Sequence, residues 1–519
     1  MGIFFNPGNG SFTKDRNYEI YVDKTELLKY LNRAIGTPGN CIAVSHARRF
    51  GKSHAAGMID AYYSLGSDSA KLFKGTKIAS DPDYEKYRNK YNVIHLDISS
   101  FWDFHKKDIV EKIIEDIFKE LKMDYPEEFD ERDRISYVLM KIYEKTGIPF
   151  VIIVDEWDCV VRNSTDQDLI HQYLQFLHSL FKSEESKSFL ALGYITGIMP
   201  IKKIKDESAL NNFEEYTMLK SRPITKYYGF TEEEVKALCK RYDMDFETTK
   251  EWYNGYLIDG MHMYNPNSVS QAMKYHDFDS YWRNTSAFGT INNFIMMNYS
   301  GLKEDVLTML SGGKVMVDTE CFQNDLAEIH SKDDALTALI HLGYLGYDAD
   351  ILSAYIPNYE VAKAFQSALK TGEWKDVAAS ISKCDTLLMA TISGNTEKVA
   401  ELIELAHDTY TSILKYNDEN SLSCVLTMAY FTAPAYYTII REMPAGKGFA
   451  DFVFLPRANA GNRPAMIVEL KYNQSADTVI RQIKEKRYQG ALSGYESKIL
   501  LVGISYDNEK HHTCSIEEW

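Results

Sequence analysis

Residues 41–63 read CIAVSHARRFGKSHAAGMIDAYY. The first five residues are apolar or small and predict a short buried strand, and the segment from Lys52 to Tyr63 predicts a helix. Gly51, Lys52 and Ser53 stand between the two, where free backbone N–H groups and the helix dipole can meet a phosphate. In a P-loop the lysine reaches the β- and γ-phosphates and the hydroxyl binds Mg²⁺. The segment therefore predicts a nucleotide site on these three residues.

The loop departs from the complete P-loop pattern at one position. The first glycine of GxxxxGK[ST] would fall at position 46, which is His46. A GKS tripeptide taken alone also fits an exposed surface turn. Arg48 and Arg49 precede the lysine and add positive charge where phosphates would bind, although arginines are also common as solvated side chains.

A second apolar strand ends in acidic residues farther along the chain. Residues 150–154 read FVIIV and are followed by Asp155, Glu156, Trp157 and Asp158. A carboxylate at the carboxyl end of a buried strand can hold Mg²⁺, and the adjacent glutamate can orient or deprotonate the attacking water. The alternative interpretation is a strand followed by a solvated acidic turn. Because both segments occur in the order expected of one α/β unit, we predict that Asp155 and Glu156 complete the nucleotide site.

Alternating strands and helices predict the fold of the first part of the chain. Apolar strands are expected at 41–45, 92–98, 150–154 and 189–195, with an amphipathic helix at 106–121. Strands separated by helices form a doubly wound parallel sheet, so the predicted class is α/β with a P-loop NTPase-type sheet. Thr196 follows the fourth strand and could contact the γ-phosphate, although a threonine at a strand end is also common without such a role.

The later part of the chain changes character twice. Helical hairpins and aromatic loops begin near Tyr227, and the chain is mainly helical from about residue 279 to residue 416. Beyond Asn417 strands return, at 435–441, 451–455, 465–470 and 498–504, with a basic helix at 478–492. The expected regions are a P-loop domain (1–225), a lid or small helical subdomain (226–285), a helical middle region (286–415) and a C-terminal α/β domain (416–519).

The last region carries a second set of acidic and basic side chains. Asp451 begins the strand within GKGFADFVFLP, and Glu469 and Lys471 are two residues apart in PAMIVELKYNQ, so that their side chains project from the same face. Two carboxylates beside a lysine form a Mg²⁺ site, where the lysine can position or activate water for attack on a phosphodiester. Glu-x-Lys is also a frequent exposed strand pattern, which leaves a solvated sheet face as the alternative.

Polar residues of the expected basic helix suit contacts with the phosphate backbone of a nucleic acid next to the metal. These residues are Gln482, Lys484, Lys486, Arg487 and Tyr488. Glu419 and Glu442 could supply a further metal ligand. The alternative for this helix, and for Arg487 in particular, is a basic solvated face.

Composition limits the class of protein. The formal net charge of −16 disfavours a general basic surface that coats nucleic acid. The segment from Arg441 to Trp519 has 11 Lys or Arg against 10 Asp or Glu, so the tail is the better candidate to approach a polyanion. Seven cysteines without a CxxC pair argue for reduced thiols. Because neither a signal-peptide pattern nor an apolar run of roughly 20 residues is seen, we expect a cytoplasmic protein with no membrane partner.

These motifs resemble those of bacterial proteins with an AAA-ATPase-like N-terminal region and a C-terminal PD-(D/E)XK nuclease-superfamily domain, and the resemblance covers nearly the whole chain. The matching segments before the tail are YVDKTELLKYL from Tyr21, ARRFGKS from Ala47, IIVDEWD from Ile152, YITGIMPI from Tyr194, LNNFEEYT from Leu210, WYNGY from Trp252, YNPNSV from Tyr264, LGYLGYD from Leu342, IPNYEV from Ile356 and NDENS from Asn417. The chain departs from the family at Ala47, Trp157 and Phe449, where proline, tyrosine and arginine are usual.

The resemblance implies ATP and Mg²⁺ as cofactors and a restriction-endonuclease-like C-terminal domain. The residues that it assigns are Gly51, Lys52, Ser53, Asp155 and Glu156 for the nucleotide, Asp451, Glu469 and Lys471 for the nuclease-type site, and Gln482 and Tyr488 for the tail helix.

Two functions are compatible with these features. The first is an enzyme in which ATP binding or hydrolysis controls Mg²⁺-dependent cleavage of nucleic acid, with DNA as the expected partner and defence against foreign DNA as its setting. The second is a nucleotide-regulated switch or binding protein whose nuclease fold serves recognition with little or no cleavage. A third interpretation treats both sites as remnants in a structural protein. A homo-oligomer is compatible with each of them.

Overall fold

The computed structural model describes residues 2–128, 134–201, 210–281, 291, 293–294, 297, 299–310, 312–320, 322, 329–369, 383–414, 425–433, 436–445, 448–456, 462–486, 498–507 and 511–519. The chain divides into two compact units. The first consists of Met1–Asp279 and Met316–Pro357, and the second of Ser280–Val315 and Asn358–Trp519. The four regions expected from the sequence remain a prediction.

A five-stranded parallel sheet forms the centre of the first unit, with the strand order β2-β3-β4-β1-β5. The register pairs Val44 with Thr196 and Asp97 with Asp155, so the carboxyl ends of neighbouring strands share one edge. The sequence predicts four of these strands but not the fifth, because EEYT is polar and forms an edge strand. The strands are β1 (Cys41–Ser45), β2 (Asn92–Asp97), β3 (Phe150–Asp155), β4 (Leu190–Gly197) and β5 (Glu214–Thr217).

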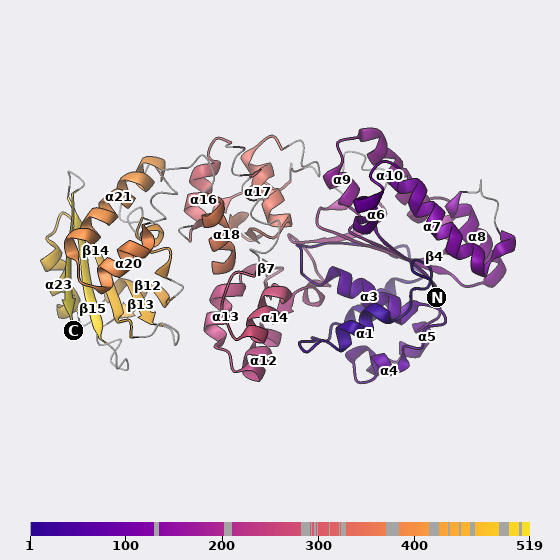
Figure 1. The fold of residues 1–519 in the computed structure, drawn as a ribbon, viewed down its shortest axis with the longest axis horizontal. Coiled ribbons are helices and arrows are strands. Elements are labelled where there is room, and N and C mark those ends of the chain that lie inside the picture. Colours follow the sequence, from indigo (N-terminus) through magenta and orange to yellow (C-terminus); the bar gives the residue numbers. More distant parts are fainter. Residues whose placement is uncertain are drawn as a thin grey trace. The chain divides into compact units, whose positions relative to one another are not determined.

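Helices cover both faces of this sheet (Figure 1). On one face, Ile109, Ile113, Ile117 and Leu121 recur every fourth residue of α7 and are buried, because this spacing places them on one side of a helix. On the other face, α3 packs into a separate apolar core through residues such as Ile59. The helices of this layer structure are α1 (Gly10–Arg16), α2 (Glu26–Ala34), α3 (Lys52–Tyr63), α4 (Ala70–Phe73), α5 (Tyr84–Tyr87), α6 (Ile98–Phe104), α7 (Ile109–Asp124), α8 (Ile135–Thr146), α9 (Cys159–Asn163), α10 (Gln167–Phe181) and α11 (Ser186–Phe189).

A small sheet and three helices follow the central sheet and hold the loop after β1. Asn265 caps α14 and donates through Nδ2 to the carbonyl oxygen of Arg48 at 3.4 Å. The N–H group of Gly229 donates to the carbonyl oxygen of Phe50 at 2.9 Å. The conformation of the GKS loop therefore depends on this later segment. Its elements, in the sheet order β6-β8-β7, are β6 (Phe230–Thr231), α12 (Glu232–Tyr242), α13 (Phe246–Tyr253), β7 (Tyr256–Ile258), β8 (Met261–Tyr264) and α14 (Pro266–Tyr275).

The last strands form a second five-stranded sheet with the order β12-β13-β14-β15-β16. β14 and β15 are parallel and the other pairs are antiparallel. The crossover between the parallel strands contains α23 (Ala476–Glu485), whose apolar side packs on one face of the sheet. Gly503 permits this packing, because a Cβ there would lie 2.7 Å from the carbonyl oxygen of Ala476. The strands are β12 (Tyr437–Ala445), β13 (Gly448–Pro456), β14 (Ala465–Tyr472), β15 (Ile499–Tyr506) and β16 (His512–Glu518).

Further helices and short strands lie between the two large sheets in sequence. The helices are α16 (Leu302–Leu310), α17 (Lys332–His341), α18 (Tyr359–Leu369), α20 (Cys384–Ile392) and α21 (Thr396–Leu414), and the strands are β9 (Val315–Met316), β10 (Gly346–Asp348) and β11 (Ser353–Tyr355). The three strands form a small sheet that the sequence does not predict, because each has only two or three residues. Within the described ranges, no helix combines the length and apolar character needed to cross a membrane.

Candidate functional site

The loop between β1 and α3 turns at two residues in the left-handed backbone region. Arg49 has a φ of 68°, and Gly51, the N-cap of α3, has a φ of 92°. No atom lies within 4 Å of the position of a Cβ at Gly51, so backbone conformation rather than space favours glycine there. Arg48, Arg49 and Ser53 are exposed. The first turn of α3 therefore presents amide groups and a hydroxyl to an approaching anion.

Lys52 is buried inside this loop. Its ammonium donates to the carbonyl oxygens of His46 at 2.8 Å and of Ala47 at 3.1 Å. Burial lowers the pKa of Lys52, whereas the nearby carboxylates of Glu156 and Asp155 oppose that shift. Phosphate oxygens could replace the two carbonyl contacts, since both are acceptors for the same donor.

His46, which stands where the P-loop pattern has glycine, packs away from solvent. Its Nε2 atom lies 2.6 Å from the Ser221 hydroxyl, and its ring lies 5.2 Å from that of Tyr228. Burial, together with the positive charge of Lys52, lowers the pKa of His46 to about 3. The imidazole is therefore neutral at pH 7, and the replacement of glycine adds no charge to the loop.

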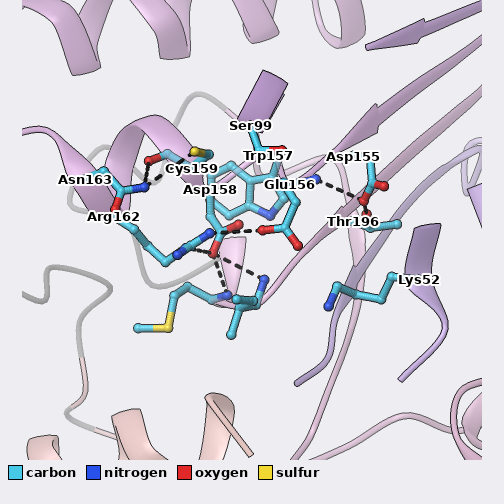
Figure 2. A network of polar contacts seen from close by, with 12 residues as sticks. Lys52, Ser99, Asp155, Glu156, Trp157, Asp158, Cys159, Arg162, Asn163 and Thr196 are labelled. Carbon is cyan, nitrogen blue, oxygen red and sulfur yellow. Dashed lines mark hydrogen bonds and ion pairs between the residues drawn. The ribbon is translucent and has the colours of Figure 1, made fainter. Parts of the chain in front are cut away.

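The acidic end of β3 lies beside the loop (Figure 2). The Thr196 hydroxyl donates to Oδ1 of Asp155, and the same oxygen accepts the N–H of Glu156 at 3.0 Å. These two hydrogen bonds fix the Asp155 carboxylate at the carboxyl edge of the sheet. The structure therefore brings Lys52, Asp155, Glu156 and Thr196 together, while their roles toward a nucleotide remain predictions.

Glu156 adopts a conformation that is unfavourable for a residue other than glycine. Its φ is 52°, in the left-handed region, which costs about 1 kcal/mol or more. Burial raises the pKa of Glu156, and the Lys52 ammonium partly offsets this effect. A carboxylate with a raised pKa is a stronger base than one with the ordinary pKa, which suits Glu156 to accept a proton.

Two residues that the sequence reasoning did not assign complete this cluster. Arg162 donates through Nη2 to Glu156 at 3.0 Å and through Nε to Asp158 at 2.7 Å. Asp158 and Arg162 are four residues apart, and this spacing places oppositely charged side chains side by side on a helix. The spacing of Asp158 and Arg162 in DEWDCVVR could therefore have indicated this ion pair, but it does not indicate the contact between Arg162 and Glu156.

A cavity of about 480 Å³ adjoins the loop. Its size falls within the range of small-ligand sites, and its lining is mainly apolar and aromatic with some polar groups. One polar contact at its wall joins His54 Nδ1 to Asp15 Oδ1 at 2.8 Å. The sequence reasoning missed the cavity, because its walls come from separate segments of the chain. Residues from these segments include Phe12, Tyr21, Gly51, Met58, Phe230, Pro266 and Gln271.

The candidate nuclease-type residues meet on the second large sheet. The N–H of Leu470 donates to Asp451 Oδ2 at 2.8 Å, and the N–H of Asp451 lies 3.3 Å from Glu469 Oε2. The Lys471 ammonium is 3.4 Å from Glu469 Oε1. The two carboxylates therefore lie on adjacent strands with the lysine beside them, as the sequence spacing predicts.

The electrostatics of this second cluster fit a bound cation. Burial, together with the negative charge of Asp451, raises the pKa of Glu469 to about 7. A divalent cation would remove the repulsion that opposes ionisation of both carboxylates. In the described part of the chain, no group of three or more His, Cys, Asp or Glu side chains is arranged to hold a metal. A site with two carboxylate ligands, whose other coordination positions are open to water or substrate, is typical of Mg²⁺.

The helix α23 packs on the same sheet and carries part of the expected nucleic-acid surface. Gln482 lies within α23 and Lys486 directly follows it, and both side chains are half-buried. Lys484 forms an ion pair with Glu517 instead. The expectations for Glu419, Arg487 and Tyr488 lie outside the described residues, as does the side chain of Glu442 in β12.

Comparison with known protein families identifies both ends of the chain. Residues 9–205 match the model of the family described as predicted AAA-ATPase. Residues 417–519 match the model of the PD-(D/E)XK nuclease superfamily. The first match contains the GKS loop and the acidic end of β3, and the second contains the Asp451, Glu469 and Lys471 cluster.

Individual proteins are similar at low sequence identity. A curated relative, the uncharacterized protein in the vnfD 5′ region of Azotobacter chroococcum mcd 1, is 24% identical over 286 residues, which are 54% of this chain and 53% of that protein. The chain thus spans about half the length of this relative. The Aeropyrum pernix ORC2 protein in ADPNP and ADP complexes has a TM-score of 0.31 at 11% identity, covering 70% of this chain and 97% of that one. The replication initiator DnaA bound to AMPPCP and single-stranded DNA has a TM-score of 0.28 at 11% identity, covering 72% and 93%.

Proposed function

Because the chain is an AAA-ATPase-like protein with a C-terminal domain of the PD-(D/E)XK nuclease superfamily, we propose that it couples ATP binding and hydrolysis to Mg²⁺-dependent cleavage of nucleic acid. The ATP part of the proposal is carried by the meeting of the buried Lys52 with Asp155 and Glu156. The nuclease part is carried by the adjacent carboxylates of Asp451 and Glu469, with Lys471 beside them.

In the proposed ATPase reaction, the amides at the start of α3 and the ammonium of Lys52 bind the β- and γ-phosphates. Ser53 and Asp155 would hold Mg²⁺, which neutralises charge on the phosphate oxygens. Thr196 keeps the Asp155 carboxylate oriented through its hydrogen bond. Glu156 accepts the proton of the attacking water, and its raised pKa favours that transfer.

The cavity beside the loop is proposed to take the nucleoside. It shares Arg49 and Gly51 with the phosphate-binding loop, so a nucleotide with its phosphates on α3 would extend into it. Its apolar and aromatic lining would bury a base, and the His54 and Asp15 pair offers polar groups at the wall.

In the proposed nuclease reaction, Asp451 and Glu469 would hold Mg²⁺, which polarises the scissile phosphate as a Lewis acid. Lys471 positions the attacking water and places a positive charge beside the phosphate. Gln482 and Lys486 contact backbone phosphates of the substrate next to the site, and Tyr488 is proposed for the same surface.

The ATPase proposal is tested by replacing Lys52. Lys52→Ala removes the buried ammonium, and we expect nucleotide affinity to fall by at least tenfold and ATP turnover to be lost. Lys29→Ala is the matched control, because Lys29 is an exposed lysine in the same domain, paired with Asp81. Equal ATP binding by the wild type and the Lys52 variant would contradict the proposal.

The nuclease proposal is tested by incubating the purified chain with ATP, Mg²⁺ and DNA or RNA in linear, circular, single-stranded and double-stranded forms. We expect cleavage by the wild type and by the control Lys484→Ala, and none by Asp451→Ala or Lys471→Ala. If every substrate stays uncut while nucleotide binds tightly and turns over slowly, a nucleotide-regulated binding protein becomes the supported function. Action in the cytoplasm against foreign DNA further predicts that expression of the wild type, but not of Lys471→Ala, lowers transformation by plasmid.

A further inference from the structure

The position of Glu156 requires an explanation, because its backbone is strained and its side chain is mostly buried. The φ of 52° disfavours every residue except glycine and, to a lesser extent, asparagine and aspartate. The side chain is only 24% exposed. Strain of this kind persists only where surrounding contacts fix the residue. The contacts around Glu156 therefore indicate what its carboxylate is held for.

Arg162 provides the principal fixed contact of that carboxylate. Its Nη2 atom lies 3.0 Å from Glu156 Oε2 (Figure 2), and the Arg162 side chain is 9% exposed. A planar guanidinium held at two of its nitrogens cannot rotate freely. The second nitrogen, Nε, is bound by Asp158 at 2.7 Å. Arg162 is thus a rigid support for Glu156 rather than a mobile surface charge.

Asp158 connects this support to the backbone after β4. The side chain of Asp158 is fully buried, and its Oδ2 atom accepts the N–H groups of Ile198 at 3.2 Å and Met199 at 3.0 Å in addition to Arg162. These amides follow Thr196, the residue whose hydroxyl binds Asp155. The end of β4 therefore contacts both acidic groups of the candidate ATPase site.

Glu156 lies between two cations. Arg162 binds it on one side, and the carboxylate acts electrostatically on the buried Lys52 on the other (Figure 2). If the ion pair with Arg162 pulled the Glu156 carboxylate away from the loop, this carboxylate would lie far from Lys52. The observed arrangement instead keeps the carboxylate directed toward the loop while Arg162 restrains it.

We propose that Arg162 is a positioning residue that aims Glu156 at the phosphate end of the nucleotide, with Asp158 anchoring Arg162 to the backbone beyond Thr196. This inference rests on the proposed ATPase function. Arg162 acts through Glu156, and it contacts neither the nucleotide nor the attacking water. A carboxylate released from this support samples other rotamers, so the proton transfer slows while nucleotide binding is unchanged.

Steady-state ATP turnover of the full chain tests this role through Arg162→Gln. We expect kcat to fall by about tenfold or more, with KM and the affinity for a non-hydrolysable ATP analogue within about twofold of wild type. The matched control is Arg134→Gln, because Arg134 also pairs with a glutamate, Glu185, at 2.6 Å but is exposed. The control should leave kcat unchanged.

A double-mutant cycle separates positioning from a structural effect. If Arg162 acts only through Glu156, adding Arg162→Gln to the Glu156→Gln variant should lower kcat no further. Independent effects of the two substitutions on kcat would instead multiply. Because Arg162→Gln leaves the buried Asp158 without its cation, we also combine Asp158→Asn with Arg162→Gln. This double variant removes both charges of the pair, and we expect it to keep the fold. It should show the same loss of kcat.

The outcomes distinguish this inference from the proposed function. Wild-type turnover that is abolished by Lys52→Ala and Glu156→Gln but unaffected by Arg162→Gln would overturn the positioning role alone. A fall in nucleotide affinity equal to the fall in kcat would overturn it as well, because a general structural effect would then explain the loss. Absence of wild-type turnover would remove the proposed ATPase function and the role of Arg162 with it.

Discussion

Glu469 should make metal binding at the C-terminal site depend on pH. Its side chain is 2% exposed, and burial with the charge of Asp451 raises its pKa from 4.5 to about 7. A metal binds the ionised carboxylate, so binding below pH 7 must first release the proton. The perturbation that tests this reasoning is Glu469→Gln, which keeps the shape of the side chain and removes the ionisable group.

The size of the effect follows from the pKa. A carboxyl group with a pKa of about 7 is about 0.9 protonated at pH 6 and about 0.1 protonated at pH 8, so metal binding should release about 0.9 and 0.1 protons respectively. Competition with the proton should also weaken the apparent affinity about tenfold at pH 6 relative to high pH. In the metal-free protein the pH dependence of stability has the opposite sign. Because the folded state binds more protons than the unfolded state between pH 4.5 and 7, the free energy of unfolding falls as pH rises through this range, by roughly 3 kcal/mol in total.

Isothermal titration calorimetry with Mn²⁺ as a substitute for Mg²⁺, in buffers of different ionisation enthalpy and without nucleotide, measures the proton release directly. We expect the pH dependence in the wild type and in Glu517→Gln, a control at an exposed glutamate paired with Lys484. Glu469→Gln should bind the metal more weakly and release no proton at either pH. Equal proton release at pH 6 and pH 8 in the wild type, or release that persists in Glu469→Gln, would refute the reasoning.

Two further substitutions test the packing around the nucleotide site. Gly197→Ala would place a Cβ 2.6 Å from Nε1 of the buried Trp157. We expect the free energy of unfolding to fall by roughly 2 kcal/mol, which thermal unfolding would show as a lower Tm. The control Gly10→Ala, with no atom within 4 Å of its Cβ, should leave Tm unchanged or slightly higher. Gln271→Trp should fill part of the cavity and weaken the binding of a fluorescent ATP analogue by about tenfold. The control Lys274→Trp, at an exposed position on the same helix outside the cavity, should leave this binding unchanged. Unchanged binding in Gln271→Trp would argue against the nucleoside site.

The strands of the central sheet were predictable where burial made them continuously apolar. Residues 150–154 are apolar on both faces because helices cover both sides of the sheet, and this pattern marks an interior parallel strand. β5 has no such signal, since EEYT lies at the sheet edge and only Tyr216 is buried. Local composition therefore identifies the four apolar strands, including β2 at the other edge of the sheet, and fails for the polar edge strand β5.

The sequence predicts which residues of the candidate sites lie together in some cases and not in others. Lys52 and Asp155 follow or end buried parallel strands, and the carboxyl ends of such strands share one edge of the sheet, so their proximity follows from the fold class. Asp451 and Glu469 instead lie within neighbouring antiparallel strands, and their proximity follows from the pairing of these consecutive strands. The Arg162 contact with Glu156 depends on side-chain direction after a left-handed turn, which no periodicity encodes. The cavity depends on segments as far apart in sequence as Phe12 and Gln271.

The two clusters share one electrostatic property that sequence spacing alone does not reveal. Near Lys52, two cations face the three carboxylates of Asp155, Glu156 and Asp158, and near Lys471 one cation faces two carboxylates. Each buried cluster therefore has one more negative than positive charge when all groups are ionised. Because an unbalanced buried charge is unfavourable, either a proton or a divalent cation must compensate it. Protons and metal ions thus compete for the same oxygens, and conditions that favour metal binding also leave Glu469 ionised.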